Sequence, residues 1–274
     1  MGRCSRTIAA FLCGWLQVIA ASAARAEDQV DLELVIAVDI SRSMDFEELI
    51  IQRKGYATAF ASKDVIDAIL GGLNGRIAVT YLEWAANALT RVLVPWTVLA
   101  SREDALNFAE ILSRTNVDRQ SRTSISGAMS AARDLFAISS LSSMRQVIDI
   151  SGDGPNNQWR RVDEMRDEIL ADGITINGLP LIVRPTDNGF GIANLDEYYE
   201  DCVIGGPGSF VLAVRSWEEF PAAVRRKLVL EITGLQPTGH QVRAIPVSTL
   251  ERAKVDCLIG EKLWRERMRD MEWR

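Results

Sequence analysis

Residues 32–43 read LELVIAVDISRS, a short run of apolar and β-branched side chains that ends in an aspartate and two serines. Such a run, bounded by a polar turn, is typical of a buried β-strand. Asp45 and Glu48 follow at the spacing of a capping box, which predicts a helix from here to about residue 69. This part of the chain is therefore a strand that leads at once into a helix, the repeating unit of α/β proteins.

The same alternation of strands and helices continues along the chain. Its patterns predict further strands at 76–84, 88–94, 146–150, 174–181 and 209–214, and further helices at 101–112, 124–136, 159–171 and 217–232. The second and third strands are joined by a short link, which predicts a hairpin, and Pro95 is expected to end the third strand. We therefore expect a Rossmann-like, doubly wound α/β domain. Its sheet should be mostly parallel with one antiparallel edge strand and should carry helices on both faces.

Residues 1–26 have the pattern of a secretory signal peptide. Two arginines precede an apolar stretch, and the small-x-small residues Ala-Arg-Ala at 24–26 fit a cleavage site. We expect export to the periplasm or the medium, a domain at 27–233, and a C-terminal extension at 234–274 packed on that domain. The leader holds three arginines and no acidic residue, so its removal changes the formal net charge from −6 to −9.

Composition excludes several classes of protein. The chain is 47% hydrophobic and 25% charged, which is ordinary for a globular protein. An acidic net charge argues against nucleic acid as a partner. The single histidine, His240, weakens every mechanism that needs a pair of histidines, such as a triad with partner histidines, an HExxH zinc site or a His-rich metal site. After the leader, no apolar run approaches the roughly 18 residues of a membrane span, so we expect none in the mature chain.

Two of the four cysteines, Cys202 and Cys257, remain after cleavage of the leader. In an exported protein, two cysteines suggest one disulfide, and two buried free thiols are the alternative. A bridge would close a loop of about 55 residues, for which chain-entropy models give roughly 4 kcal/mol. It would fasten the C-terminal tail to the body of the domain.

Polar residues cluster in the turn after the first strand. Asp39 ends a buried strand, where an unpaired carboxylate is costly, and the hydroxyls of Ser41 and Ser43 follow at two-residue intervals. One carboxylate and two hydroxyls form a hard oxygen set suited to Mg²⁺ or Mn²⁺. The alternative is structural, with Ser43 or Asp45 capping the helix and Asp39 bonding to loop amides.

Two other loops can supply oxygens to the same edge, because function in open α/β sheets lies at the carboxyl ends of the strands. Thr123 precedes a predicted helix, and Asp153 follows a predicted strand. Each also has an ordinary explanation, as a helix N-cap and as an Asp-Gly turn.

Together the three loops resemble the metal-ion-dependent adhesion site of von Willebrand factor A (vWA) domains. The five matching positions are Asp39, Ser41, Ser43, Thr123 and Asp153. The resemblance covers about residues 30–232. The strings ISGDGPNN at 150–157 and YYEDCVIGGPG at 198–208 are similar to an exported bacterial branch catalogued as domain of unknown function 1194. One departure is visible: many vWA domains have Thr-Asp-Gly at the third loop, where this chain has Ser-Gly-Asp-Gly.

This resemblance implies a Mg²⁺ or Mn²⁺ site that binds a partner protein. In such sites the two serines, and sometimes the threonine, contact the ion directly, and the aspartates do so directly or through water. A Glu or Asp carboxylate of the partner completes the octahedron. Neutral hydroxyls leave the ion electron-poor, so it keeps affinity for that carboxylate. We therefore expect a divalent-cation-dependent adhesion or scaffold module rather than an enzyme.

Two other functions remain open. The Asp153 loop also looks like the last acidic motif of haloacid-dehalogenase-type phosphatases, in which Asp39 would be the nucleophile. However, Ser41 stands where those enzymes have a second acid, and no lysine lies between Lys63 and Lys227 to bind phosphate. The other alternative is a structural vWA domain with an inactive site.

Trp159 lies a few residues beyond the third loop. It could contact a partner, because exposed aromatic side chains often anchor interfaces. Packing at the start of the next helix is the alternative.

Overall fold

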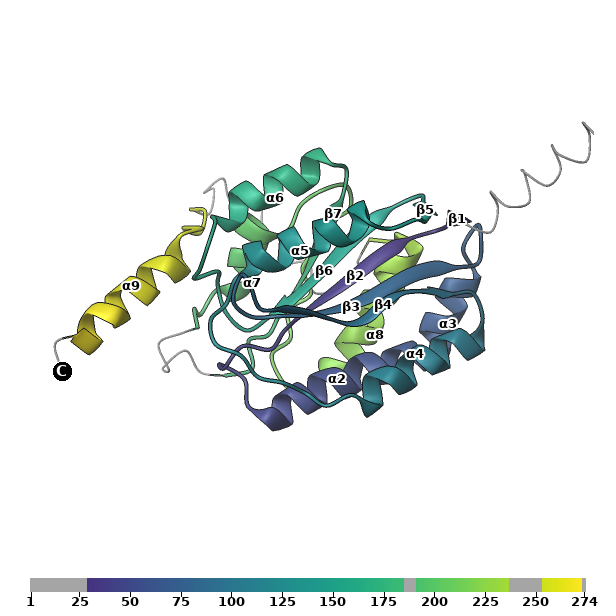
Figure 1. Ribbon diagram of the computed structural model, residues 1–274, viewed down its shortest axis with the longest axis horizontal. Coiled ribbons are helices and arrows are strands. Elements are labelled where there is room, and N and C mark those ends of the chain that lie inside the picture. Colours follow the sequence, from purple (N-terminus) through teal and green to yellow (C-terminus); the bar gives the residue numbers. More distant parts are fainter. Residues whose placement is uncertain (1–28, 185–190, 237–252, 273–274) are drawn as a thin grey trace, which may run out of the picture.

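The computed structural model describes residues 29–184, 191–236 and 253–272. Its centre is a five-stranded sheet in the order β4-β3-β2-β6-β7 (Figure 1). These strands are β2 (Glu33–Asp39), β3 (Ile77–Trp84), β4 (Thr90–Leu99), β6 (Gln146–Gly152) and β7 (Thr175–Pro180). In this sheet β3 and β4 pair antiparallel at one edge, and the other neighbours pair parallel. The expected α/β class is therefore confirmed, including the antiparallel edge strand.

β2 is the central strand, and all of its residues are buried. Parallel neighbours bond to both of its edges, and helices cover both faces of the sheet, which explains its continuous apolar run. In the pairing of β2 with β6, Val38 lies opposite Ser151. The carboxyl ends of these two strands therefore lie side by side, and Asp39 stands next to the turn that follows β6.

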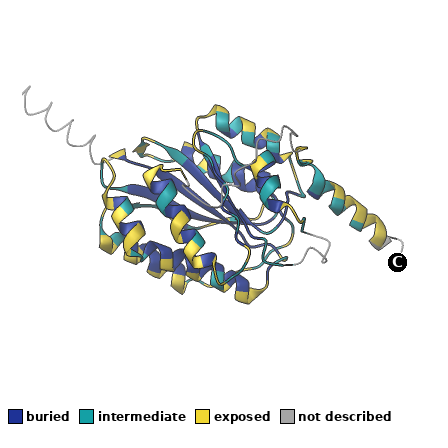
Figure 2. Ribbon diagram, turned by 180° about the vertical axis from the view of Figure 1, so that it is seen from behind, coloured by how far each residue is buried: buried dark blue, intermediate teal, exposed yellow. Residues whose placement is uncertain are grey.

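Helices form a layer on each face of the sheet (Figure 1). One layer contains α2 (Phe46–Phe60), α3 (Lys63–Leu70), α4 (Arg102–Arg114) and α8 (Phe220–Thr233). The other contains α5 (Ile125–Ala137), α6 (Val162–Ala171), α7 (Leu195–Tyr198) and the π-helical turn η2 (Tyr199–Val203). Figure 2 shows buried strands between these layers and exposed residues on the outer surfaces of the helices.

Two of the predicted boundaries in the first half of the chain are wrong. The single helix expected up to about residue 69 is two helices, because the side chain of Ser62 accepts a hydrogen bond from the N–H of Val65 and starts α3. The third strand does not end at Pro95, since β4 continues to Leu99. Pro95 lies on the edge strand near a shift in register, where its missing N–H removes no ladder bond.

Two predictions in the second half also differ from the structure. Residues 209–214 form isolated bridges and not a strand. Val211 bridges to Gly178 of β7, and Val214 bridges to Leu181, just beyond the end of β7. The helix expected from residue 159 begins at Val162, because Trp159 has a positive φ of 73° that a helix cannot contain.

Several further elements complete the structure. A small parallel pair joins β1 (Gln29–Val30) to β5 (Ser142–Ser143), and α9 (Ile259–Glu272) projects from the body near the carboxyl ends of the strands (Figure 1). No helix in the described part of the chain has the length and apolarity needed to cross a bilayer. The predicted leader at 1–26 and His240 lie outside the described residues.

Candidate metal centre

The first loop of the centre is the turn that follows β2. Asp39 is fully buried, and its Oδ1 accepts a hydrogen bond of 2.7 Å from the backbone N–H of Ser41. The hydroxyl oxygens of Ser41 and Ser43 lie 2.7 Å apart. This short turn therefore gathers three oxygen-bearing side chains into one small volume.

The third loop meets the first at this point. Ser43 Oγ donates a hydrogen bond of 2.6 Å to Oδ1 of Asp153, although the two residues are 110 positions apart in sequence. Asp153 directly follows β6, whose end lies beside the end of β2. Four of the five predicted ligands, Asp39, Ser41, Ser43 and Asp153, are thereby brought together.

The second loop is held against both of the others. Thr123 donates its backbone N–H to Oδ1 of Asn157 at 3.1 Å, and the N–H of Asn157 donates to the Thr123 carbonyl at 2.9 Å. On the other side, the N–H of Gln120 donates to the carbonyl of Ile40 at 2.9 Å. Ser124 then caps α5. The fifth predicted ligand, Thr123, is therefore fixed by backbone contacts to the loops that carry the other four.

The two carboxyl groups of the centre are held in an environment that disfavours their charge. Burial, with the nearby Asp153, raises the pKa of Asp39 well above its ordinary range. Burial also raises the pKa of Asp153 to about 6, although its bond from Ser43 and the charge of Arg184 oppose this. Oδ2 of Asp39 is buried and has no hydrogen-bond partner in the structure. A cation at this point would favour both charged carboxylates and would give that oxygen a partner.

The donor set fits a hard divalent cation. It consists of carboxylate and hydroxyl oxygens, which suit Mg²⁺ and Mn²⁺ better than softer ions. Among the described residues there is no cluster of three or more His, Cys, Asp or Glu side chains that could hold a metal. The candidate centre has two carboxylates, and its other proposed ligands are hydroxyls.

Arg184, which the sequence did not single out, supports the first loop. It follows β7, donates to Glu48 Oε1 at 2.9 Å, and also bonds the carbonyl of Ser43. Trp217 Nε1 donates to the same Glu48 oxygen at 2.9 Å. No local pattern marks Arg184, since its partners are more than 130 residues away in the sequence.

Asn156 links the third loop to the C-terminal segment. Its Oδ1 accepts from the N–H of Ser126 at 3.1 Å, its Nδ2 donates to Glu261 of α9 at 2.7 Å, and its backbone N–H donates to the Tyr198 hydroxyl at 3.2 Å. The guanidinium group of Arg122, next to Thr123, lies 3.7 Å from the centre of the Trp264 ring of α9. The start of α9 therefore borders two of the three loops.

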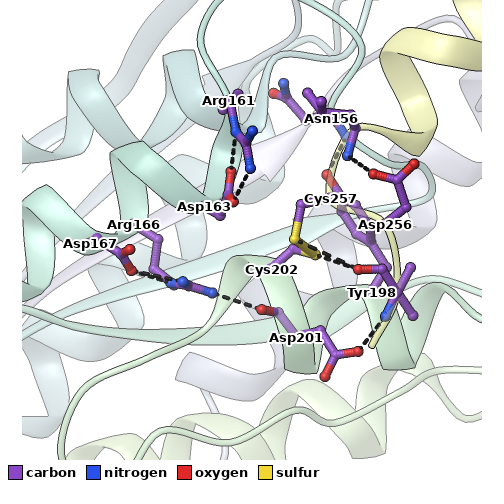
Figure 3. The surroundings of a disulfide bond; sticks show 12 residues. Asn156, Arg161, Asp163, Arg166, Asp167, Tyr198, Asp201, Cys202, Asp256 and Cys257 are labelled. Carbon is purple, nitrogen blue, oxygen red and sulfur yellow. Dashed lines mark hydrogen bonds and ion pairs between the residues drawn. A yellow bond between two sulfur atoms is a disulfide. The ribbon is translucent and has the colours of Figure 1, made fainter. Parts of the chain in front are cut away.

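A disulfide joins Cys202 of η2 to Cys257, just before α9 (Figure 3). Beside it, Asp201 accepts a hydrogen bond of 2.8 Å from the N–H of Val255. Figure 3 also shows Tyr198 and Asn156 close to the bridge. The segment from Val255 onward is therefore fastened covalently to the body, next to the third loop.

Trp159 lies outside the cluster of predicted ligands. It stands in the loop between β6 and α6, and 47% of its surface is exposed. α6 begins only at Val162, three residues beyond Trp159. The guanidinium of Arg160 lies 6.0 Å from the centre of its ring.

Solved structures with a similar fold include a matrix protein, a pilus adhesin and a vWF domain. Proximal thread matrix protein 1 from the mussel byssus matches with 12% identity over 74% of this chain and 48% of that chain, at a TM-score of 0.55. The pilus adhesin SpaC from Lactobacillus rhamnosus GG matches with 10% identity over 74% of this chain and 30% of that chain, also at 0.55. The vWF domain of the type V pili tip protein Mfa5 from Porphyromonas gingivalis matches with 10% identity over 77% and 98%, at 0.50. This chain thus spans less than half the length of the first two proteins.

These comparisons show the fold, which this chain shares with a vWF domain, a pilus adhesin and a matrix protein. The match in sequence is more specific than the match in fold. Residues 29–236 match the family described as "Protein of unknown function (DUF1194)", and the chain belongs to that family. A comparison with curated proteins finds no match.

Proposed function

We propose that this protein is an exported module that binds a partner protein through a divalent cation. Asp39, Ser41, Ser43, Thr123 and Asp153 hold Mg²⁺ or Mn²⁺, and a Glu or Asp carboxylate of the partner completes the coordination. The observation that carries the proposal is the buried Oδ2 of Asp39, which has no partner, in the turn where Oδ1 accepts from Ser41 and the hydroxyls of Ser41 and Ser43 lie 2.7 Å apart. An unpaired buried carboxylate oxygen is costly, and a cation offsets that cost.

The chemistry of the set supports carboxylate capture. Hydroxyl ligands bring no charge, so an ion held by two aspartates keeps its affinity for another anion. The disulfide and the likeness to a pilus adhesin and a byssus matrix protein support export to an oxidising compartment. The predicted leader at residues 1–26 supports the same localisation.

Calorimetric titration of the mature protein with Mg²⁺ and with Mn²⁺ tests the centre. Wild type should bind one ion, and Asp39→Asn should weaken binding by at least about 10-fold, because it removes a charged ligand without changing the size of the side chain. The matched control is Asp118→Asn, which removes an exposed carboxylate outside the cluster and should bind like wild type. If wild type binds no ion, or binds it as weakly as Asp39→Asn, the centre is disproved.

The partner is tested separately. Immobilised wild type and Ser41→Ala are incubated with envelope proteins in Mg²⁺ or in EDTA. We expect proteins retained by wild type in Mg²⁺ to be lost in EDTA and with Ser41→Ala. An identical set in all four conditions would refute cation-dependent capture.

A further inference from the structure

The side chain of a buried tyrosine, Tyr199, reaches the edge of the candidate metal centre. Tyr199 is the first residue of η2, its side chain is fully buried, and its hydroxyl has no hydrogen-bond partner in the structure. The adjacent Tyr198 differs, because its hydroxyl accepts the backbone N–H of Asn156. A π-helical turn is rare and is often found at functional sites. The unpartnered hydroxyl therefore needs an explanation beyond packing.

Two glycines on adjacent strands make room for this side chain. A Cβ atom at Gly178 of β7 would lie 2.6 Å from Cδ1 of the Tyr199 ring. A Cβ atom at Gly152 of β6 would lie 3.0 Å from the Tyr199 hydroxyl and 3.0 Å from Oδ2 of Asp39. The ring therefore lies over β7, and its hydroxyl reaches the end of β6. Glycine inside a strand often marks such a close approach.

The two polar atoms that a Cβ atom at Gly152 would approach are chemically complementary. Oδ2 of Asp39 is an acceptor without a donor, and the Tyr199 hydroxyl is a donor without an acceptor. A tyrosine phenol carries its proton at neutral pH and can therefore donate a hydrogen bond. Gly152 is also the position at which this chain departs from the Thr-Asp-Gly pattern of many vWA domains.

We propose that Tyr199 is a positioning residue of the metal centre, whose hydroxyl donates to Oδ2 of Asp39 when the cation is bound and so orients that carboxylate toward the ion. The inference rests on the proposed function, because it assigns Tyr199 a role only if the centre binds a cation. Hydrogen bonds to a ligating carboxylate fix its orientation, and their removal typically costs about 10- to 100-fold in metal affinity. A glycine is then needed at position 152 because a Cβ atom there would lie 3.0 Å from both oxygens, and not because a turn requires it.

The test compares Tyr199→Phe with Tyr198→Phe in the full mature protein. Mn²⁺ affinity is measured by calorimetry, and the melting temperature is measured in EDTA. Tyr199→Phe should weaken Mn²⁺ binding about 10-fold or more and should leave the melting temperature in EDTA unchanged or higher, because the lost hydroxyl had no partner. Tyr198→Phe should lower the melting temperature in EDTA, because the N–H of Asn156 loses its acceptor.

A second variant and a spectrum add independent readouts. Gly152→Ala puts a methyl group between the two oxygens and should also weaken Mn²⁺ binding. Addition of Mn²⁺ to wild type should perturb the ultraviolet absorption of tyrosine, and this perturbation should be absent in Tyr199→Phe.

The outcomes separate this inference from the proposed function. If wild type binds no Mn²⁺, the proposed function fails and the inference fails with it. If wild type binds Mn²⁺ and Tyr199→Phe binds it equally well, only the role of Tyr199 is overturned. That role is also overturned if Tyr199→Phe does not fold or melts lower in EDTA, since the hydroxyl would then be structural.

Discussion

A buried charge cluster beneath the sheet should make the stability of this protein fall as pH rises toward neutrality. Lys227 of α8 lies 2.7 Å from Oδ1 of Asp149 on β6 and also pairs with Glu231, one turn further along the helix. The side chains of all three residues are at most 1% exposed. One lysine cannot neutralise two carboxylates, so the fully ionised cluster holds an excess negative charge away from water. Burial, and then the charge of Asp149, raises the pKa of Glu231 to about 7.

The sign and size of the effect follow from this pKa. The ordinary value for a glutamate is 4.5, so between about pH 4.5 and 7 the folded protein binds a proton that the unfolded chain has lost. Stability therefore falls as pH rises through this window. At about 1.4 kcal/mol per unit of pKa, the loss is about 3 kcal/mol above pH 7 and only about 1 kcal/mol at pH 5.

Glu231→Gln isolates this contribution. Glutamine keeps the shape of the side chain and can still accept the hydrogen bond of 3.0 Å from Asn177, but it carries no charge. We expect the variant to exceed wild type in free energy of unfolding by up to about 3 kcal/mol at pH 8 and by about 1 kcal/mol or less at pH 5. Urea denaturation in EDTA measures both values. Glu110→Gln, a change at an exposed glutamate, should differ from wild type by less than about 0.5 kcal/mol at either pH.

One outcome would contradict this account of the cluster. If Glu231→Gln is less stable than wild type by the same amount at pH 5 and at pH 8, Glu231 is ionised throughout and Lys227 stabilises its charge. The raised pKa, and the pH dependence derived from it, would then be wrong.

Three further predictions concern the loops and the C-terminal segment. Replacing both Cys202 and Cys257 by alanine should lower the free energy of unfolding by about 4 kcal/mol in urea. It should also weaken Mn²⁺ binding, because the bridge fastens the C-terminal segment next to the third loop. An unchanged Mn²⁺ affinity would show that the bridge acts on stability alone. Asn157→Ala removes the acceptor for the N–H of Thr123 and should weaken Mn²⁺ binding about 10-fold by calorimetry. Asn157→Asp keeps the acceptor and should retain most of the affinity. Equal losses of affinity in both variants would contradict this role of Asn157. Trp159→Ala should change the free energy of unfolding by less than about 0.5 kcal/mol and should bind Mn²⁺ normally. It should retain less partner protein than wild type. Full retention would show that Trp159 does not contact the partner.

The parts of the fold that depend on local sequence could be predicted. The apolar run before Asp39 specifies a buried strand wherever it pairs, and the capping box at Asp45 and Glu48 is present as expected. The predicted boundaries of helices and strands were wrong where one residue is compatible with two local structures. Ser62 could continue a helix or start a new one, and Pro95 could end a strand or lie on its edge.

The supporting residues of the site could not be predicted, for a different reason. Arg184 and Tyr199 reach the centre from segments far along the chain, and their positions depend on how β7 and η2 pack against the sheet. Arg184 leaves no trace in the sequence. The trace of Tyr199 is indirect, in the glycines at positions 152 and 178 that leave space for its ring and its hydroxyl. The five proposed ligands could be proposed from the sequence because each lies at the end of a predicted strand or just before a predicted helix.

The pairing of β2 with β6 has a consequence for folding kinetics. Ser43 and Asp153 meet only after strands more than 100 residues apart have aligned, and such non-local pairing is slow to form. If the centre is completed only in this last alignment, a bound cation stabilises the native state and not the transition state that precedes it. Mn²⁺ should then leave the folding rate unchanged and slow unfolding, because the ion stabilises only the folded domain.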